Sequence, residues 1–223
     1  MAQQARELIE EARRGIAPVG ARIRQHPYLG VLEARKLDRG ILGIFAGQQR
    51  HIIESDLRSV ALVAARSDSQ ATRDFFLEML RGERAALEAL EAFGKAVGLS
   101  GDRLAAAEPL PGAFAYSAYV AWLALYGSAA EFAGAFLVNL EAWGANCGRM
   151  SRALQDRYGL TTQDVAFFDL FATPPPGFED GGLAVVDEGL AGGVDPARIR
   201  RAARLLQGYE LLYWDTMLQA AQA

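Results

Sequence analysis

The chain has 223 residues, of which 51% are hydrophobic and 22% are charged, and its formal net charge is −4. These proportions are those of a globular protein, and they exclude disordered and collagen-like chains. Lys and Arg are scattered among Asp and Glu and form no basic stripe that would neutralise phosphates. We therefore expect no nucleic-acid partner.

The N-terminal residues carry charges where a secretion signal needs an apolar core, and no uncharged apolar run is long enough to span a bilayer. Cys147 is the only cysteine, so no internal disulfide can form, which is typical of a reducing compartment. His26 and His51 are the only histidines, too few for a structural zinc site or a di-metal centre. We expect a cytoplasmic protein with no membrane contact and no metal or other cofactor.

Helical periodicity dominates the sequence, and no convincing alternating strand pattern is present. In chain order the apolar spacing and the flanking polar residues predict helices over residues 3–23, 38–57, 69–90, 114–126, 128–150, 161–172, 183–190 and 195–217. Residues 100–111 contain Gly101, Pro109 and Pro111 and are predicted to form a connection.

Several helix starts have a specific capping residue. Asp38 and Ser69 precede apolar runs and can accept hydrogen bonds from free backbone amides. Ser128 and Glu131 have the spacing of a capping box. Asp195 is followed by a proline, which favours the first helical position. No repeat or linker interrupts the pattern, so we expect one all-α domain over residues 1–223, with roughly seven or eight helices and a pocket between them.

Three motifs occur in order along the chain. They read His-Pro-Tyr-Leu-Gly at 26–30 with Gln-Gln at 48–49, a tyrosine at 116 with Gly-Ser-Ala-Ala-Glu-Phe at 127–132, and Tyr-Glu-Leu-Leu-Tyr-Trp-Asp at 209–215. Together they resemble the TenA (thiaminase II) family. The resemblance implies a heme-oxygenase-like multi-helix bundle with a central enclosed pocket. Because members of this family commonly form tetramers, it also implies a homo-oligomer, either a dimer or a tetramer.

The resemblance further implies a particular chemistry. In the family a cysteine adds to a pyrimidine ring, an aspartate holds the aminopyrimidine edge, tyrosines shape the pocket and a glutamate moves protons. Tyr116 and Glu210 match this pattern, whereas the cysteine position falls on Asn139, the aspartate position on Gln49 and a pocket tyrosine on Trp143. Asparagine is not a competent nucleophile, and glutamine lacks the charge that would hold a protonated ring.

Glu210 is the strongest candidate for a catalytic residue. It lies in a run of Leu, Tyr and Trp, where a carboxylate is costly unless it is paired or used. A raised pKa there would suit proton transfer. The alternative is a carboxylate that is merely satisfied by a tyrosine hydroxyl.

The candidate binding residues are polar amides and aromatic rings. Gln49 and Asn139 are expected either to clamp a flat heterocycle or to form a structural network with each other or with water. Tyr116, Trp143 and Tyr213 are expected either to wall the ligand or to be ordinary core.

Three functions remain open. The first is a divergent TenA-like protein that binds or hydrolyses a small nitrogen heterocycle, thiamine- or pyrimidine-related, with water as nucleophile. The second is an aminopyrimidine aminohydrolase of thiamine metabolism with a rearranged site. The third is a non-catalytic protein that senses a ligand or regulates. Fold alone does not choose among them.

Overall fold

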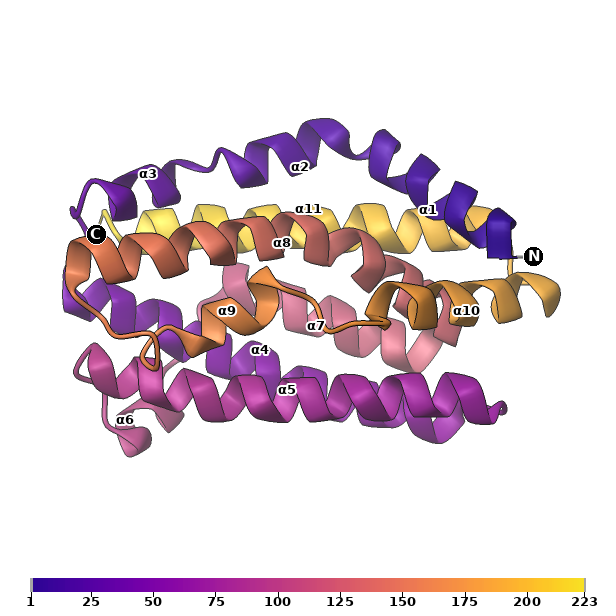
Figure 1. The fold of residues 1–223 in the computed structure, drawn as a ribbon, viewed down its shortest axis with the longest axis horizontal. Helices are drawn as coiled ribbons and strands as arrows, with labels where there is room; N and C mark the ends of the chain where they lie inside the picture. Colours follow the sequence, from indigo (N-terminus) through magenta and orange to yellow (C-terminus); the bar gives the residue numbers. More distant parts are fainter. Residues whose placement is uncertain (1, 223) are drawn as a thin grey trace.

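The computed structural model describes residues 2–222, and every regular element in that range is an α-helix (Figure 1). The helices are α1 (Ala2–Gly15), α2 (Ala17–Arg24), α3 (Pro27–Glu33), α4 (Arg39–Arg66), α5 (Gln70–Ala96), α6 (Gly101–Ala105), α7 (Pro111–Tyr126), α8 (Ala129–Tyr158), α9 (Ala166–Ala172), α10 (Phe178–Ala191) and α11 (Pro196–Ala220). The expected all-α fold is confirmed. In this range, no helix has both the length and the apolar character needed to cross a bilayer.

The predicted helix starts are confirmed where a side chain caps them. Asp38 accepts a hydrogen bond from an amide of the first turn of α4, and Ser69 does the same for α5. Ser128 and Glu131 form the complete capping box of α8. Asp195 accepts from the first turn of α11. Each cap satisfies amides that the helix itself cannot, so a local signal was sufficient to place it.

Several predicted elements differ in extent, and residues 2–222 form eleven helices where seven or eight were expected; the helix predicted over 183–190, for example, begins at Phe178. The helix expected over residues 3–23 is divided at Ile16 into α1 and α2, because Pro18 has no amide hydrogen to continue the hydrogen-bond ladder. Residues 161–165 form a turn held by Thr161 and Asp164, so α9 begins only at Ala166. The predicted connection after Ser100 contains the short helix α6, which Ser100 caps.

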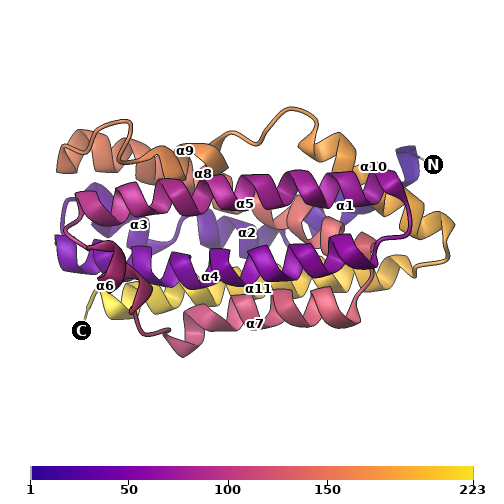
Figure 2. The ribbon, with the colours of Figure 1, turned by 90° about the horizontal axis from the view of Figure 1, so that it is seen from below.

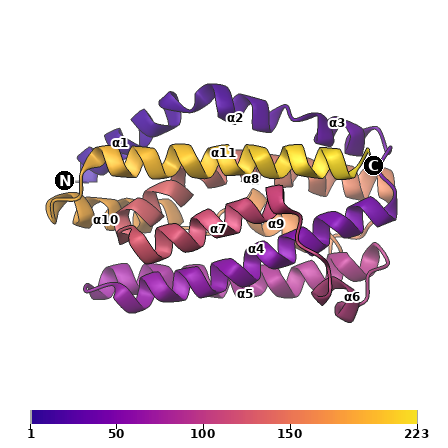
Figure 3. The same ribbon diagram turned by 180° about the vertical axis from the view of Figure 1, so that it is seen from behind.

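The long helices lie side by side and enclose the interior. Figure 1 shows α8 and α11 in the middle, α1, α2 and α3 following one another along one side, and α4 and α5 on the other. Helix α7 packs against both α4 and α11, as seen from behind in Figure 3. Helices α9 and α10 pack against α8, and in Figure 2 they lie along the edge next to α5. The interior is therefore bounded by helices distant in sequence.

The buried apolar side chains form two clusters, and the boundary between them is where the site lies. One cluster includes Phe132 and Phe136, and the other includes Phe45 and Trp214. Ile52 of α4 and Leu140 of α8 pack against both clusters. Both residues also line the central cavity, which therefore lies at the junction of the two halves of the core.

Close approach of α9 to α8 depends on a glycine. A Cβ atom added to Gly144 would lie 2.6 Å from the backbone carbonyl oxygen of Phe171, which is a severe clash. We expect Gly144→Ala to lower the free energy of unfolding by about 1–3 kcal/mol, because backbone must move to admit the methyl group. Urea denaturation measures the change.

Gly148, one helical turn further along α8, is the matched control. Its added Cβ would lie 3.5 Å from the Ala172 Cβ, an ordinary van der Waals contact. Gly148→Ala should leave stability unchanged or raise it by up to about 1 kcal/mol, since alanine favours helix. Equal effects of the two substitutions would contradict the close packing of α9 on α8.

Candidate functional site

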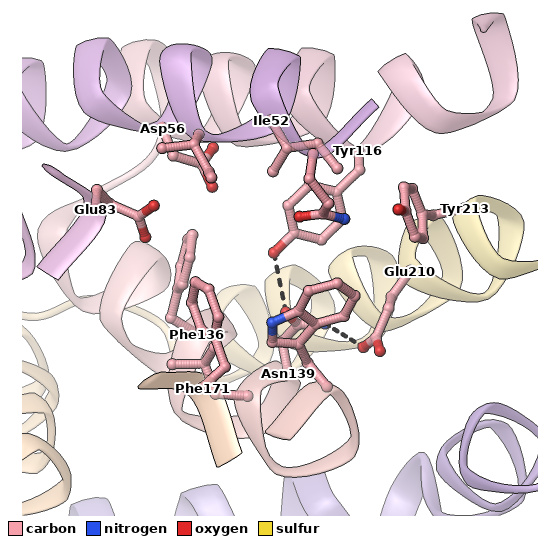
Figure 4. A pocket seen from close by; sticks show the side chains of 13 residues that line it. Ile52, Asp56, Glu83, Tyr116, Phe136, Asn139, Phe171, Glu210 and Tyr213 are labelled. Carbon is pink, nitrogen blue, oxygen red and sulfur yellow. Dashed lines mark hydrogen bonds between the residues drawn. The ribbon is translucent and has the colours of Figure 1, made fainter. Parts of the chain in front are cut away.

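A cavity lies in the middle of the bundle and is lined by side chains from α4, α5, α7, α8, α9 and α11 (Figure 4). The cavity encloses about 40 Å³ of space that a water-sized molecule can occupy. Ligand pockets in proteins are commonly about 300–1,000 Å³. The central cavity is smaller than this, so a ligand of heterocycle size enters it only when the side chains that line it move apart.

Three polar residues from three helices form a hydrogen-bonded chain beside the cavity. The Tyr116 hydroxyl on α7 donates to Asn139 Oδ1 on α8 over 2.9 Å. Asn139 Nδ2 donates in turn to Glu210 Oε2 on α11 over 2.7 Å. Figure 4 shows this chain running from Tyr116 through Asn139 to Glu210. The orientation of the Asn139 amide is fixed, because its oxygen and its nitrogen have different partners.

Glu210 is buried, with only 2% of its surface exposed. Besides Asn139, its carboxylate accepts hydrogen bonds from Gln207 Nε2 over 2.9 Å and from Trp214 Nε1 over 3.1 Å. Burial raises the pKa of Glu210 to about 8, and the three hydrogen bonds and Arg24 offset only part of this effect. At neutral pH the carboxyl group is therefore largely protonated but close to its titration point, which suits a general acid or base.

Asn139 occupies the place where the resemblance put a cysteine nucleophile. Both of its polar atoms bond to the protein, so the amide holds Tyr116 and Glu210 in position. We expect Asn139→Leu to lower the free energy of unfolding by about 1–3 kcal/mol, because it leaves the buried Tyr116 hydroxyl without an acceptor. Thermal and urea unfolding measure this loss.

Tyr116→Phe provides the comparison for that substitution. It removes a single hydrogen bond and should cost only about 0.5–1.5 kcal/mol. In the Tyr116→Phe, Asn139→Leu double variant the two losses should be less than additive, since both remove the same bond. Strict additivity would show that the bond between Tyr116 and Asn139 contributes nothing.

The other candidate residues from the sequence also line the cavity. These are Gln49, Trp143 and Tyr213. Burial raises the pKa of the Tyr213 hydroxyl well above its usual value. The nearby Gln49 amide offsets only part of this rise. The hydroxyl nevertheless has no hydrogen bond of good geometry. A ligand that offered an acceptor would therefore satisfy Tyr213.

Trp143 forms an aromatic wall that other rings hold in place. It is stacked parallel to Phe45 with ring centroids 6.5 Å apart, and Tyr213 meets it edge-on at 6.1 Å. Phe136 and Phe171 line the cavity on the side labelled at the lower left of Figure 4. Flat rings around the cavity favour a flat ligand, because stacked and edge-on contacts add to the apolar area buried.

Cys147 does not replace the missing nucleophile. Its side chain is fully buried in the apolar cluster that contains Trp214. Burial raises the pKa of the thiol well above its usual value, and Glu210 and Asp169 raise it further. A thiol in this state is inert, since only the thiolate is nucleophilic.

The two histidines have structural partners. His26 caps α3 through Nδ1, which accepts from the Tyr28 amide, while Nε2 bonds to Asp215 over 3.1 Å. His51 bonds to the Ala107 carbonyl oxygen. Within residues 2–222, no group of three or more His, Cys, Asp or Glu side chains is arranged to hold a metal ion.

Two charged residues of the cavity were missed by the sequence reasoning. Asp56 of α4 and Glu83 of α5 line the cavity, and both are buried. A signal for each existed. Asp56 follows Gln49 and Ile53 at helical spacing, and Glu83 lies in the same way within the apolar stripe of α5. Neighbouring charged residues concealed both, because they make each segment look like a solvated helix face.

Comparison with known proteins identifies the family. Residues 13–166, more than half of the chain, match the model of the TENA/THI-4/PQQC family. The chain belongs to this family. No match to a curated protein reaches significance. The expected membership of the TenA group is thus confirmed at the level of the family.

Solved structures of TenA homologues share the fold. A TenA homologue from Pseudomonas syringae has 13% sequence identity and a TM-score of 0.81, covering 94% of this chain and 92% of its own. One from Pyrococcus furiosus has 19% identity and a TM-score of 0.75, covering 94% and 99%. A Shewanella denitrificans domain of unknown function, described as having a heme oxygenase-like fold, has 15% identity and a TM-score of 0.77, covering 96% and 93%. The predicted heme-oxygenase-like fold is confirmed.

Proposed function

We propose that this TenA-family protein binds a small nitrogen heterocycle, thiamine- or pyrimidine-related, in the central cavity and hydrolyses it with Glu210 as the acid–base group. The observation that carries the proposal is the state of Glu210. Its carboxyl group is buried beside the cavity, is held by three donors and has a pKa of about 8. Such a group exchanges a proton readily near neutral pH.

The walls of the cavity suit the recognition of a heterocycle. Trp143 and Phe171 supply apolar ring faces, while the Gln49 amide and the Tyr213 hydroxyl supply polar groups. An amide both donates and accepts, so Gln49 complements an edge on which a ring nitrogen lies beside an amino group. Glutamine is neutral, which favours an uncharged ring edge at this position over the protonated ring that an aspartate would hold.

The reaction requires water as the nucleophile, because Asn139 offers none and both of its polar atoms are bonded. In hydrolysis of an aminomethyl-pyrimidine, the water oxygen bonds to the methylene carbon as the carbon–nitrogen bond breaks. Protonated Glu210 gives its proton to the leaving amine and then takes one from the water. The products are the hydroxymethyl-pyrimidine and ammonia, and Glu210 ends in its starting state.

The test is to incubate the purified protein with 4-amino-5-aminomethyl-2-methylpyrimidine and, separately, with thiamine. Mass spectrometry follows the release of the hydroxymethyl-pyrimidine. Turnover that Glu210→Gln abolishes supports the proposal and places the protein in thiamine metabolism. Turnover that survives this substitution would contradict the role of Glu210.

A second candidate is a non-catalytic ligand-binding or regulatory protein. The replacement of the family's cysteine by Asn139 favours it, because the amide stabilises a resting network instead of reacting. Saturable binding of the pyrimidine without any product, at high protein concentration, would select this function over hydrolysis.

We also propose that the protein is a homo-oligomer. Large apolar side chains remain exposed on α7 and at one position of the neighbouring α11, namely Phe114, Trp122, Leu125, Tyr126 and Leu212. Exposed apolar groups of this size commonly mark contact surfaces. Sedimentation velocity distinguishes a monomer from a dimer or a tetramer.

A further inference from the structure

Two buried carboxyl groups share the cavity with Glu210. Asp56 of α4 is 3% exposed and Glu83 of α5 is 9% exposed, and both line the cavity. Asp56 Oδ1 has no hydrogen-bond partner. A buried acceptor without a partner is rare and costly, so it calls for an explanation.

The electrostatics of the pair disfavour the ionisation of both carboxyl groups together. Burial raises the pKa of Glu83 to about 7, and burial together with the charge of Glu83 raises the pKa of Asp56 well above its usual value. No neighbouring cation or hydrogen bond is among the causes acting on either group. Two adjacent buried carboxyl groups ionise together only when a positive charge joins them.

The pair lies at the opposite end of the cavity from Glu210. In Figure 4, Asp56 and Glu83 are on the left, Glu210 and Tyr213 are on the right, and Tyr116 lies between the two ends. Burial is the main cause of the raised pKa of Tyr116, and the negative charges of Asp56, Glu210 and Glu83 raise it further, in agreement with its intermediate position. A ligand that filled the cavity would therefore meet carboxyl groups at both ends.

We propose that Asp56 and Glu83 form a cation subsite that binds a protonated amine or an amidinium group of the ligand. The inference rests on the proposed function in that the other end of the same ligand lies at Glu210, where bond cleavage takes place. The substrate class is accordingly a small aromatic nitrogen heterocycle that is bound with a proton on a ring nitrogen remote from the bond that is cleaved.

The chemistry of the pair fits this class of group. An ammonium or amidinium nitrogen donates several hydrogen bonds, and Asp56 Oδ1 is a free acceptor. Charge-assisted bonds of this kind are strongest where water is excluded. The bound cation stabilises the ionised carboxylates, so binding at neutral pH releases protons from the pair. The remaining titratable groups that line the cavity, within the described chain, are Tyr116, Glu210 and Tyr213.

The test uses simple probes and does not require turnover. Benzylamine and benzamidine carry a cationic group on a flat ring, and benzyl alcohol and benzamide are their neutral counterparts. Isothermal titration calorimetry should show that each cation binds at least tenfold more tightly than its neutral counterpart. Titrations at pH 7 in two buffers of different ionisation enthalpy should show net proton release for the cations only.

Matched variants assign the effect to the pair. Asp56→Asn and Glu83→Gln keep the shape of each side chain but remove the negative charge, so the preference for cations and the proton release should both disappear. Glu88→Gln alters an exposed carboxylate on the same helix as Glu83 and should change neither. Glu210→Gln should retain the preference for cations, because it acts at the other end of the cavity.

The outcomes separate this inference from the proposed function. A preference for cations that is lost in Asp56→Asn supports the subsite even if no pyrimidine is hydrolysed. Pyrimidine turnover without any preference for cations overturns the subsite and leaves the proposed function intact. Equal binding of the cations and their neutral counterparts, binding of none of the four probes, or absence of proton release from the wild-type protein also overturns it. In each of those cases the two carboxyl groups merely share a proton within the fold.

Discussion

The free energy of unfolding is expected to fall as the pH rises from about 5 to about 9. The pKa values of Glu83, about 7, and Glu210, about 8, lie above the usual 4.5 for a glutamate, and that of Asp56 is raised too. The folded state therefore binds more protons than the unfolded state across this range. Stability is complete below the unfolded pKa values and is lost as the pH passes through the folded ones.

Each unit of pKa displacement corresponds to about 1.4 kcal/mol, so the total fall should amount to several kcal/mol. Urea denaturation at a series of pH values measures it. Asp56→Asn combined with Glu83→Gln should make the profile shallower, leaving the part that comes from Glu210, because neither amide titrates, whereas Glu88→Gln should leave the slope unchanged. Glu33 and Asp164 have lowered pKa values and act with the opposite sign, but only at more acidic pH. Stability that is constant or rising above pH 5 would contradict the burial of these carboxyl groups.

Glu210→Gln is expected to lower kcat/KM for the aminomethyl-pyrimidine by at least about 100-fold, because an amide cannot transfer the proton. The substitution keeps the size of the side chain and can preserve several contacts, so the fold should be retained, as judged by circular dichroism. The loss should appear mainly in kcat. Steady-state kinetics with product quantified by mass spectrometry measures both parameters.

Glu141→Gln is the control for this substitution. Glu141 lies on α8 close to Asn139, but its side chain is exposed and pairs with Arg13 and Arg24 at the surface. Its loss should change kcat/KM less than about twofold, because exposed ion pairs contribute little. Full activity of the Glu210→Gln protein would show that Glu210 has only a structural role.

Much of the fold was predictable because its signals are local. Asp38, Ser69, Ser128 and Asp195 each cap a helix through an amide within three residues, and such short-range geometry depends little on tertiary context. The division of the first helix at Ile16 was missed although Pro18 is visible in the sequence. Proline is also tolerated in the first turn of a helix, so its presence at position 18 does not by itself show where one helix ends and the next begins.

The site was predictable only in part. Glu210 was identified because a single carboxylate among Leu, Tyr and Trp implies burial. The bond from Asn139 to Glu210 joins residues that are 71 positions apart, so it depends on how α8 packs against α11. Helical spacing alone was not enough to predict that Asp56 and Glu83 line the cavity. Only the packing of α4 against α5 shows that both side chains face one cavity and not solvent.

The most direct test of the central claim is a calorimetric titration with 4-amino-5-hydroxymethyl-2-methylpyrimidine, the product of the proposed hydrolysis. We predict one molecule bound per chain, with an affinity at least about tenfold weaker in Glu210→Gln, because a buried carboxyl that bonds the ligand has been replaced. No binding by the wild-type protein, or equal binding by the wild-type and Glu210→Gln proteins, would contradict the assignment of this cavity as a heterocycle site.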